Sequence, residues 1–152
     1  MATFTNVTRG QMAAHLEPQG FRVMTIEGTK ELLWGKVFRK GDTVVSMRIY
    51  TGINPSGESR AVGTDAMRVE LWYRSAEGEV RRVGGSKRVH RVEGWAANLQ
   101  SRIDGWEDQL GPLCPTCDAP TALRKPKVAA KWQPFYGCTN YPNCKGTIRA
   151  AA

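Results

Sequence analysis

The residues best equipped for chemistry in this chain are four cysteines near its C-terminal end. Two residues separate Cys114 from Cys117 in CPTC, and five separate Cys138 from Cys144 in CTNYPNC. A CxxC turn presents two thiolates from one knuckle, and four thiolates make the tetrahedral shell that structural Zn²⁺ takes in proteins. The spacing predicts one structural Zn²⁺ held by all four, with disulfide pairing as the alternative chemistry.

The choice between a metal site and disulfides depends on the cellular compartment, and the rest of the sequence indicates which compartment to expect. No apolar run approaches the roughly 18 residues of a spanning helix, and the first ten residues lack the basic and apolar regions of a signal peptide. We therefore expect an intracellular, cytoplasmic protein without a membrane partner, associated with the nucleoid if it binds DNA. Thiols in a reducing compartment are more often metal ligands than disulfides.

The residues around the cysteines resemble the C4 zinc ribbon repeated at the C-termini of type IA DNA topoisomerases. The resemblance covers only about residues 112–149 and departs from the family at Asp118, where the family has Gly, and in a longer, more basic segment between the cysteine pairs. The matching positions are Cys114, Pro115, Cys117, Leu123, Phe135, Gly137, Cys138, Tyr141, Pro142, Cys144 and Lys145. The resemblance implies a zinc ribbon that binds single-stranded DNA, and it implies no catalysis, since the family's tyrosine nucleophile works inside a clamp several times longer than this chain.

The types of residue in the ribbon suit nucleic acid. Aromatic rings stack on unpaired bases, and lysine or arginine side chains follow the phosphates. The candidates are Trp132, Phe135, Tyr136, Tyr141, Lys125, Lys127, Lys131, Lys145 and Arg149. The alternative is that the aromatic residues simply cover the metal and supply the small core of the module.

The remaining charge points to a second contact area. The chain has a formal net charge of +8, which favours a polyanionic partner. The segment RRVGGSKRVHR, residues 81–91, is basic throughout, and Arg60 lies in the long Gly-rich loop that follows Tyr50. The candidate contacts here are Arg81, Arg82, Lys87, Arg88, Arg91 and Arg60. A solvated strand face is the alternative.

The elements that must position these residues form two units. Thr8 and Gln11 fit a capping box that starts a short helix, and strand patterns follow at 21–27, 31–39, 43–50, 66–75 and 79–92. An apolar stripe from Trp95 to Leu110 predicts an amphipathic helix over the sheet. We expect an α+β fold: an antiparallel sheet of about five strands flanked by two helices in residues 1–110, then the small zinc ribbon in 111–152.

Two of the predicted strands alternate clearly between apolar and polar residues. Val45, Met47 and Ile49 point to one face of the sheet, and Met67, Val69, Leu71 and Tyr73 do the same in the next strand. The opposite face carries arginines interleaved with Tyr50 and Trp72. This second face is either solvated or a platform for a ligand.

The leading functional hypothesis is a non-catalytic, zinc-containing DNA-binding protein that favours single-stranded DNA and assists replication, recombination or repair. One alternative is an adaptor whose ribbon docks on a replication or transcription assembly. The other is a small metal-dependent nuclease built on Asp65, Glu70 and Glu79. The segment GGSKR lacks the first glycine and the hydroxyl residue of a phosphate-binding loop, so nucleotide hydrolysis is not expected.

Overall fold

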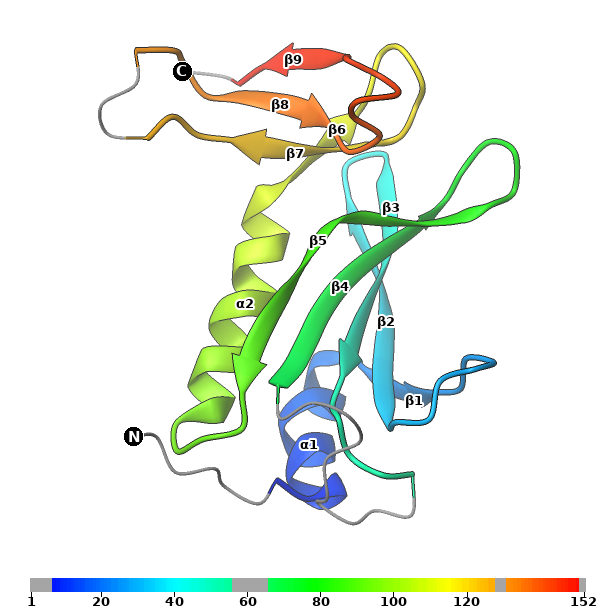
Figure 1. The fold of residues 1–152 in the computed structure, drawn as a ribbon, viewed down its shortest axis with the longest axis vertical. Coiled ribbons are helices and arrows are strands. Elements are labelled where there is room, and N and C mark those ends of the chain that lie inside the picture. Colours follow the sequence, from blue (N-terminus) through cyan, green and yellow to red (C-terminus); the bar gives the residue numbers. More distant parts are fainter. Residues whose placement is uncertain (1–6, 56–65, 128–130, 151–152) are drawn as a thin grey trace.

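A computed structural model of the 152-residue chain describes residues 7–55, 66–127 and 131–150. Two antiparallel sheets and two α-helices make up the fold, which confirms the α+β class (Figure 1). The first part of the chain contains α1 (Arg9–Leu16), η1 (Glu17–Gln19), β1 (Arg22–Met24), β2 (Leu33–Lys40), β3 (Thr43–Tyr50), β4 (Ala66–Arg74), β5 (Val80–His90) and α2 (Trp95–Gln109). The second part contains β6 (Leu110–Leu113), β7 (Pro120–Arg124), β8 (Phe135–Cys138) and β9 (Thr147–Arg149).

The larger sheet is a meander of five strands in the order β1-β2-β3-β4-β5. Each strand pairs in antiparallel fashion with its sequence neighbour, although the connection from β3 to β4 is long. A register shift interrupts the pairing of β4 with β5 between Val69 and Leu71. The number of strands agrees with the sequence prediction, although β1 is shorter than the pattern at 21–27 indicated.

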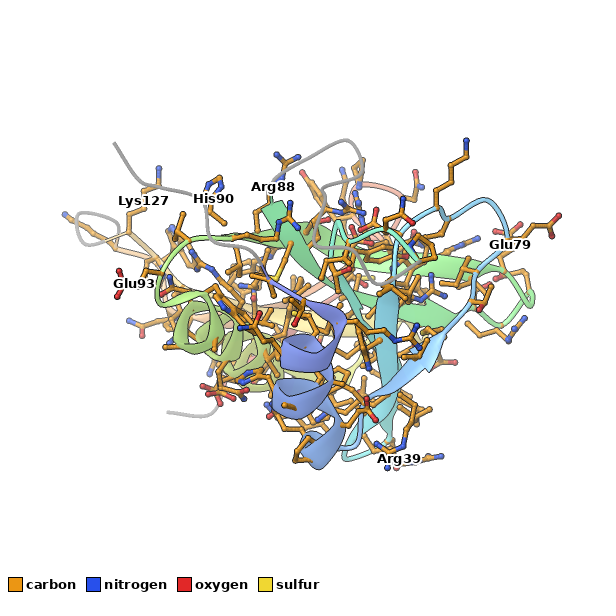
Figure 2. All side chains as sticks on the ribbon, turned by 90° about the horizontal axis from the view of Figure 1, so that it is seen from below. Arg39, Glu79, Arg88, His90, Glu93 and Lys127 are labelled. Carbon is orange, nitrogen blue, oxygen red and sulfur yellow. The ribbon has the colours of Figure 1, made fainter. Side chains whose placement is uncertain are left out.

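One face of this sheet is the core, and both helices lie on it. Met47 and Leu71, which pair across β3 and β4, have no exposed surface, as the alternating pattern predicted. The stripe of α2 packs there through Leu99, Ile103 and Trp106, all buried. Seen along the sheet, α1 and α2 occupy the same side, which leaves the other side without a helix (Figure 2).

The ends of the helices follow local chemistry. The Thr8 hydroxyl accepts from the Gln11 amide while the Gln11 side chain accepts from the Thr8 amide, so the predicted capping box is present. The α-helix ends at Leu16, because Pro18 cannot continue it, and one 3₁₀ turn leads to Gly20 with a φ of 98°. Neither helix of the described part is long and apolar enough to span a membrane.

The smaller sheet begins directly where α2 ends. The sequence pattern extended the helix to Leu110, but Leu110–Leu113 forms strand β6, the first of the order β6-β7-β8-β9. The Thr43 hydroxyl in β3 donates to the Gly111 carbonyl at 2.9 Å, which ties the two sheets together. The buried apolar cluster also runs on from the larger sheet through Leu110 to Cys114. The smaller sheet therefore packs directly against the larger one.

Candidate metal centre and its surroundings

The four cysteine sulfurs converge on one point at the end of the smaller sheet. All four Sγ atoms lie within 4.8 Å of one another, with 3.8 Å between Cys114 and Cys144 and 3.4 Å between Cys117 and Cys138. Three of the residues are buried and Cys117 is partly exposed. None forms a disulfide. This arrangement positions four thiolates to bind one metal ion.

Backbone hydrogen bonds fix the two turns that carry the sulfurs. The Cys114 amide donates to the Ala119 carbonyl at 2.7 Å, which closes the first knuckle. The Cys138 amide donates to the Gly146 carbonyl at 3.0 Å across the second, and the Asn140 amide points at the Cys138 sulfur at 3.4 Å. Amides aimed at thiolate sulfurs are typical of the outer shell of a metal site.

Two positions in the knuckles are explained by geometry. Asp118 stands where the topoisomerase pattern has Gly, and it adopts a φ of 62°, the left-handed conformation that glycine tolerates best and that Asp tolerates better than most residues. Gly146 cannot carry a side chain, because a Cβ atom there would overlap the Cys114 sulfur and lie 3.2 Å from the Thr116 hydroxyl. Both features keep the chain close around the sulfurs.

The surroundings of the thiols shift their pKa values in opposite directions. Burial raises the pKa of Cys138, and burial also raises that of Cys117. Burial acts the same way on Cys114, but the amides of Thr116 and Cys117 and the neighbouring thiols outweigh it and lower the pKa to about 7. Without metal, the thiols of Cys117 and Cys138 are therefore protonated at neutral pH.

Metal affinity should fall steeply as the pH is lowered. A metal must displace the protons on Cys117 and Cys138, whose pKa values are raised, so binding releases at least two protons and is favoured as pH rises. Each displaced proton changes the apparent affinity by about tenfold per pH unit, and well below pH 7 the Cys114 thiol is protonated as well, so we expect at least roughly a thousandfold loss per unit there. Competition titrations with a chelator over a pH series measure this. An affinity independent of pH would contradict thiolate ligation.

An aromatic groove lies beside the cysteines on one face of the smaller sheet. It has a volume of about 720 Å³ and is lined by Trp132, Phe135 and Tyr141 together with Arg124 and Lys145. Tyr141 is 68% exposed and Trp132 is 45% exposed, and the Trp132 ring meets Phe135 edge to face at 5.5 Å. The side chains thus offer two open ring faces and two cations in one concave surface.

The groove depends on a glycine and on strand pairing. Phe135 pairs with Arg124 across β7 and β8, which places both side chains on the same face. A Cβ atom at Gly137 would lie 3.3 Å from the Phe135 ring and 3.5 Å from the Arg124 side chain, so glycine lets both lie flat over the strand. Arg124 is a groove residue that the sequence hypotheses omitted. The sequence could have indicated this contact, because Arg124 lies in the basic segment LRKPK shortly before the aromatic residues.

Other predicted contacts of the ribbon lie elsewhere. Tyr136 points to the opposite face of β8, where its ring packs against Gly111 and Thr121. It therefore does not join the other three aromatic residues. The remaining predicted cations, all exposed, lie between β7 and β8 or on β9: Lys125, Lys127, Lys131 and Arg149. Arg149 pairs with Phe135 and so lies on the groove face.

The basic residues of β5 do not form one surface. Arg82 and Arg88 point to the sheet face without helices, where Figure 2 shows Arg88. Lys87 lies on the helix side, with its ammonium 4.8 Å from the centre of the Trp106 ring. Burial lowers the pKa of Lys87, and the positive charge of Arg102 lowers it further. Arg81 pairs with Glu79 at 2.8 Å, and Arg91 is 5% exposed.

The structure also bears on the residues considered for other chemistry. Arg60 and Asp65 lie outside the described residues. Glu70 is buried and forms ion pairs with Arg68 and Arg82, whereas Glu79 is exposed beside Arg81. Within residues 7–55, 66–127 and 131–150, the four cysteines are the one group of three or more potential metal ligands.

Comparison with known proteins identifies no relative of this chain. No family model matches the chain, and neither a curated protein nor a solved structure matches it. The likeness of residues 112–149 to a topoisomerase ribbon therefore depends on the matching residues themselves. What the geometry establishes is a cluster of four cysteines on a small antiparallel sheet, positioned to bind one metal ion.

Proposed function

We propose that this chain is a non-catalytic, zinc-stabilised protein that binds single-stranded DNA and assists replication, recombination or repair. The observation that carries the proposal is the groove of Trp132, Phe135, Tyr141, Arg124 and Lys145 built directly beside the cysteine cluster. A base needs a flat apolar surface and its phosphate needs a cation, and the groove supplies both.

The exposure of the aromatic rings separates this role from a purely structural one. Rings that served only to cover the metal would be buried, as Cys114 and Cys138 are. Trp132 and Tyr141 instead expose large parts of their side chains, which is unfavourable in water unless a partner covers them. An unpaired strand exposes its bases for such stacking, whereas a duplex hides them, so the groove favours single strands.

Zinc is the metal that best fits the donor set. Four thiolates in a tetrahedral arrangement suit Zn²⁺ or an iron–sulfur centre, and Mg²⁺ or Ca²⁺ prefers oxygen. Two knuckles that carry all ligands on one small sheet are typical of a structural zinc site. The residues that would hold the ion are Cys114, Cys117, Cys138 and Cys144. Its contribution is to hold the turn before Tyr141 in place.

Replacing both exposed rings should weaken DNA binding strongly. Each stack is worth about 1–3 kcal/mol, so Trp132→Ala combined with Tyr141→Ala should reduce affinity for a single-stranded oligonucleotide by roughly 30-fold or more. Fluorescence anisotropy with labelled single-stranded DNA, duplex DNA and RNA of one sequence measures the loss and the preference. Wild-type affinity should fall steeply with salt, because cations and phosphates contribute together.

The matched control is Tyr136→Ala, since Tyr136 is an aromatic residue of the same sheet that points away from the groove. Its binding should stay near wild type provided that metal content is unchanged. Equal losses in both variants would argue that the aromatic residues act through folding alone. A wild-type protein that binds none of the three nucleic acids would overturn the proposal and favour the adaptor alternative.

A further inference from the structure

The sheet face that carries no helix holds a second groove. It has a volume of about 370 Å³ and lies across β2, β3, β4 and the start of β5. Its lining combines apolar and cationic side chains: Val37, Val44, Ser46, Arg48, Trp72, Arg74 and Val80. Both helices are on the other side of the sheet, so no described helix covers this groove (Figure 2).

Exposed apolar side chains gather in the two grooves. Six large hydrophobic residues of the described part are exposed, and two of them, Trp132 and Tyr141, line the ribbon groove. Three more line the groove on the sheet, with Val37 65%, Val44 42% and Val80 45% exposed. A concentration of exposed valines on the open face of a sheet is unfavourable in water and indicates a surface that a partner covers.

The charges on this open face identify the chemistry of the partner. Arg48, Arg74 and Arg88 form no ion pair with a described carboxylate, and all three point to this face. The acidic residue at its centre, Glu70, is buried and already paired with Arg68 and Arg82. The surface that remains accessible is positive, so an anion is the complementary partner.

The arginine at the centre of the groove is held in place before any partner arrives. The Arg48 guanidinium lies 4.6 Å from the centre of the Trp72 ring, and it donates to the Tyr50 hydroxyl at 3.3 Å. The Trp72 ring is itself fixed, because its Nε1 donates to Glu70 at 3.1 Å. A guanidinium stacked on one ring can present its other face to a base, which is a common mode of contact with single strands.

A small cavity at the junction of the two sheets lies between the linings of the two grooves. Arg74 lines the groove on the sheet and also this cavity of about 70 Å³, whose opposite wall includes Cys117 and Asn140 of the ribbon. The next residue, Tyr141, lines the ribbon groove. A strand bound in the ribbon groove would reach the sheet past this cavity, whose lining also includes Arg81 and the acidic residues Glu77 and Asp118.

From this juxtaposition we propose that the open face of β2–β5 is a second binding site for single-stranded DNA, occupied by the continuation of the strand held in the ribbon groove. This inference rests on the proposed function, which it extends from the ribbon to the first unit of the chain. Bases contact the valines and the Arg48 guanidinium, and phosphates contact Arg74 and Arg88. The bound strand is then longer than the ribbon alone can hold.

The test compares short and long oligothymidylates with the full chain. Arg74→Ala combined with Arg88→Ala removes two exposed cations of the open face. Anisotropy should show at least roughly tenfold weaker binding of the long oligonucleotide. The slope of the logarithm of the binding constant against the logarithm of the salt concentration should become shallower by about 1.4, because two phosphate contacts are lost. Binding of an oligonucleotide too short to leave the ribbon should change by less than about twofold, because its contacts are untouched.

The matched control is Arg9→Ala combined with Lys30→Ala, which removes the same charge from exposed positions that line neither groove. Equal effects of the two double variants on the long oligonucleotide would overturn the second site, since only net charge would then matter. A wild-type affinity that does not increase with length would overturn it as well. Loss of binding in Trp132→Ala/Tyr141→Ala tests the ribbon separately, so failure of either proposal is distinguishable from failure of the other.

Discussion

Gly146→Ala is expected to reduce the affinity of the four-cysteine centre for Zn²⁺ by roughly a hundredfold or more. A methyl group at this position would overlap the Cys114 sulfur and lie 3.5 Å from the Cys144 sulfur. The chain must then move away, and the Gly146 carbonyl that accepts from the Cys138 amide moves with it. Loss of such outer contacts typically costs 10- to 100-fold in metal affinity, and here a ligand is displaced as well. Competition with a chelator at constant pH measures the change.

Gly85→Ala is the matched control, because a Cβ atom at Gly85 would meet no other atom within 4 Å. Its metal affinity should equal that of the wild type. Unchanged affinity in Gly146→Ala would show that the sulfurs do not close around a common point. Since metal binding and ribbon folding are coupled, DNA binding by Gly146→Ala should also recover when excess Zn²⁺ is added.

Trp106→Ala is expected to lower the free energy of unfolding by about 3–5 kcal/mol. Trp106 is 3% exposed and is the last buried side chain of α2 before the chain enters β6. Its Nε1 donates to the Val69 carbonyl at 3.2 Å, and the Lys87 ammonium lies over its ring. The substitution therefore leaves a cavity and a buried carbonyl without its donor. Urea denaturation followed by far-ultraviolet circular dichroism measures the loss.

Two substitutions test the cause of that loss. Trp106→Phe keeps most of the buried area but removes the donor, so it should cost about 1–3 kcal/mol. Trp132→Ala deletes the same side chain at a position that is 45% exposed and should cost less than about 1 kcal/mol. A loss at Trp106 no greater than that at Trp132 would contradict its role in holding α2 on the sheet.

The sequence predicted the elements well because their signals are local. Strict alternation in 43–50 and 66–75 and the apolar spacing from Trp95 onward match the strands and helix that form, and Thr8 and Gln11 make their predicted cap. The spacing within each cysteine knuckle was equally local, since each knuckle is a single turn. The convergence of the two knuckles is not local, because it joins residues 21 and 30 positions apart. The end of α2 was harder to predict, because β6 needs a partner strand ten residues further along the chain to form.

The alternation of side chains along β5 divides its basic residues between the two faces of the sheet. Neighbouring residues of a strand point to opposite faces, so Arg81 and Arg82 separate, as do Lys87 and Arg88. The same period places Tyr136 and Phe135 on opposite faces of β8. Strand alternation in the sequence would have divided both sets before the structure was known.

By itself, then, the sequence determined the two cysteine pairs, the alternation of the sheet and the stripe of the covering helix, because each depends on residues close together in the chain. Only the tertiary structure decided that Arg124 joins the ribbon groove and that Val37, Val44 and Val80 share a groove with Arg48. It also decided that the sheet groove comes close to the ribbon beside Arg74. These associations depend on strand register and on the packing of the two sheets, which join segments too far apart in sequence for any local pattern to encode.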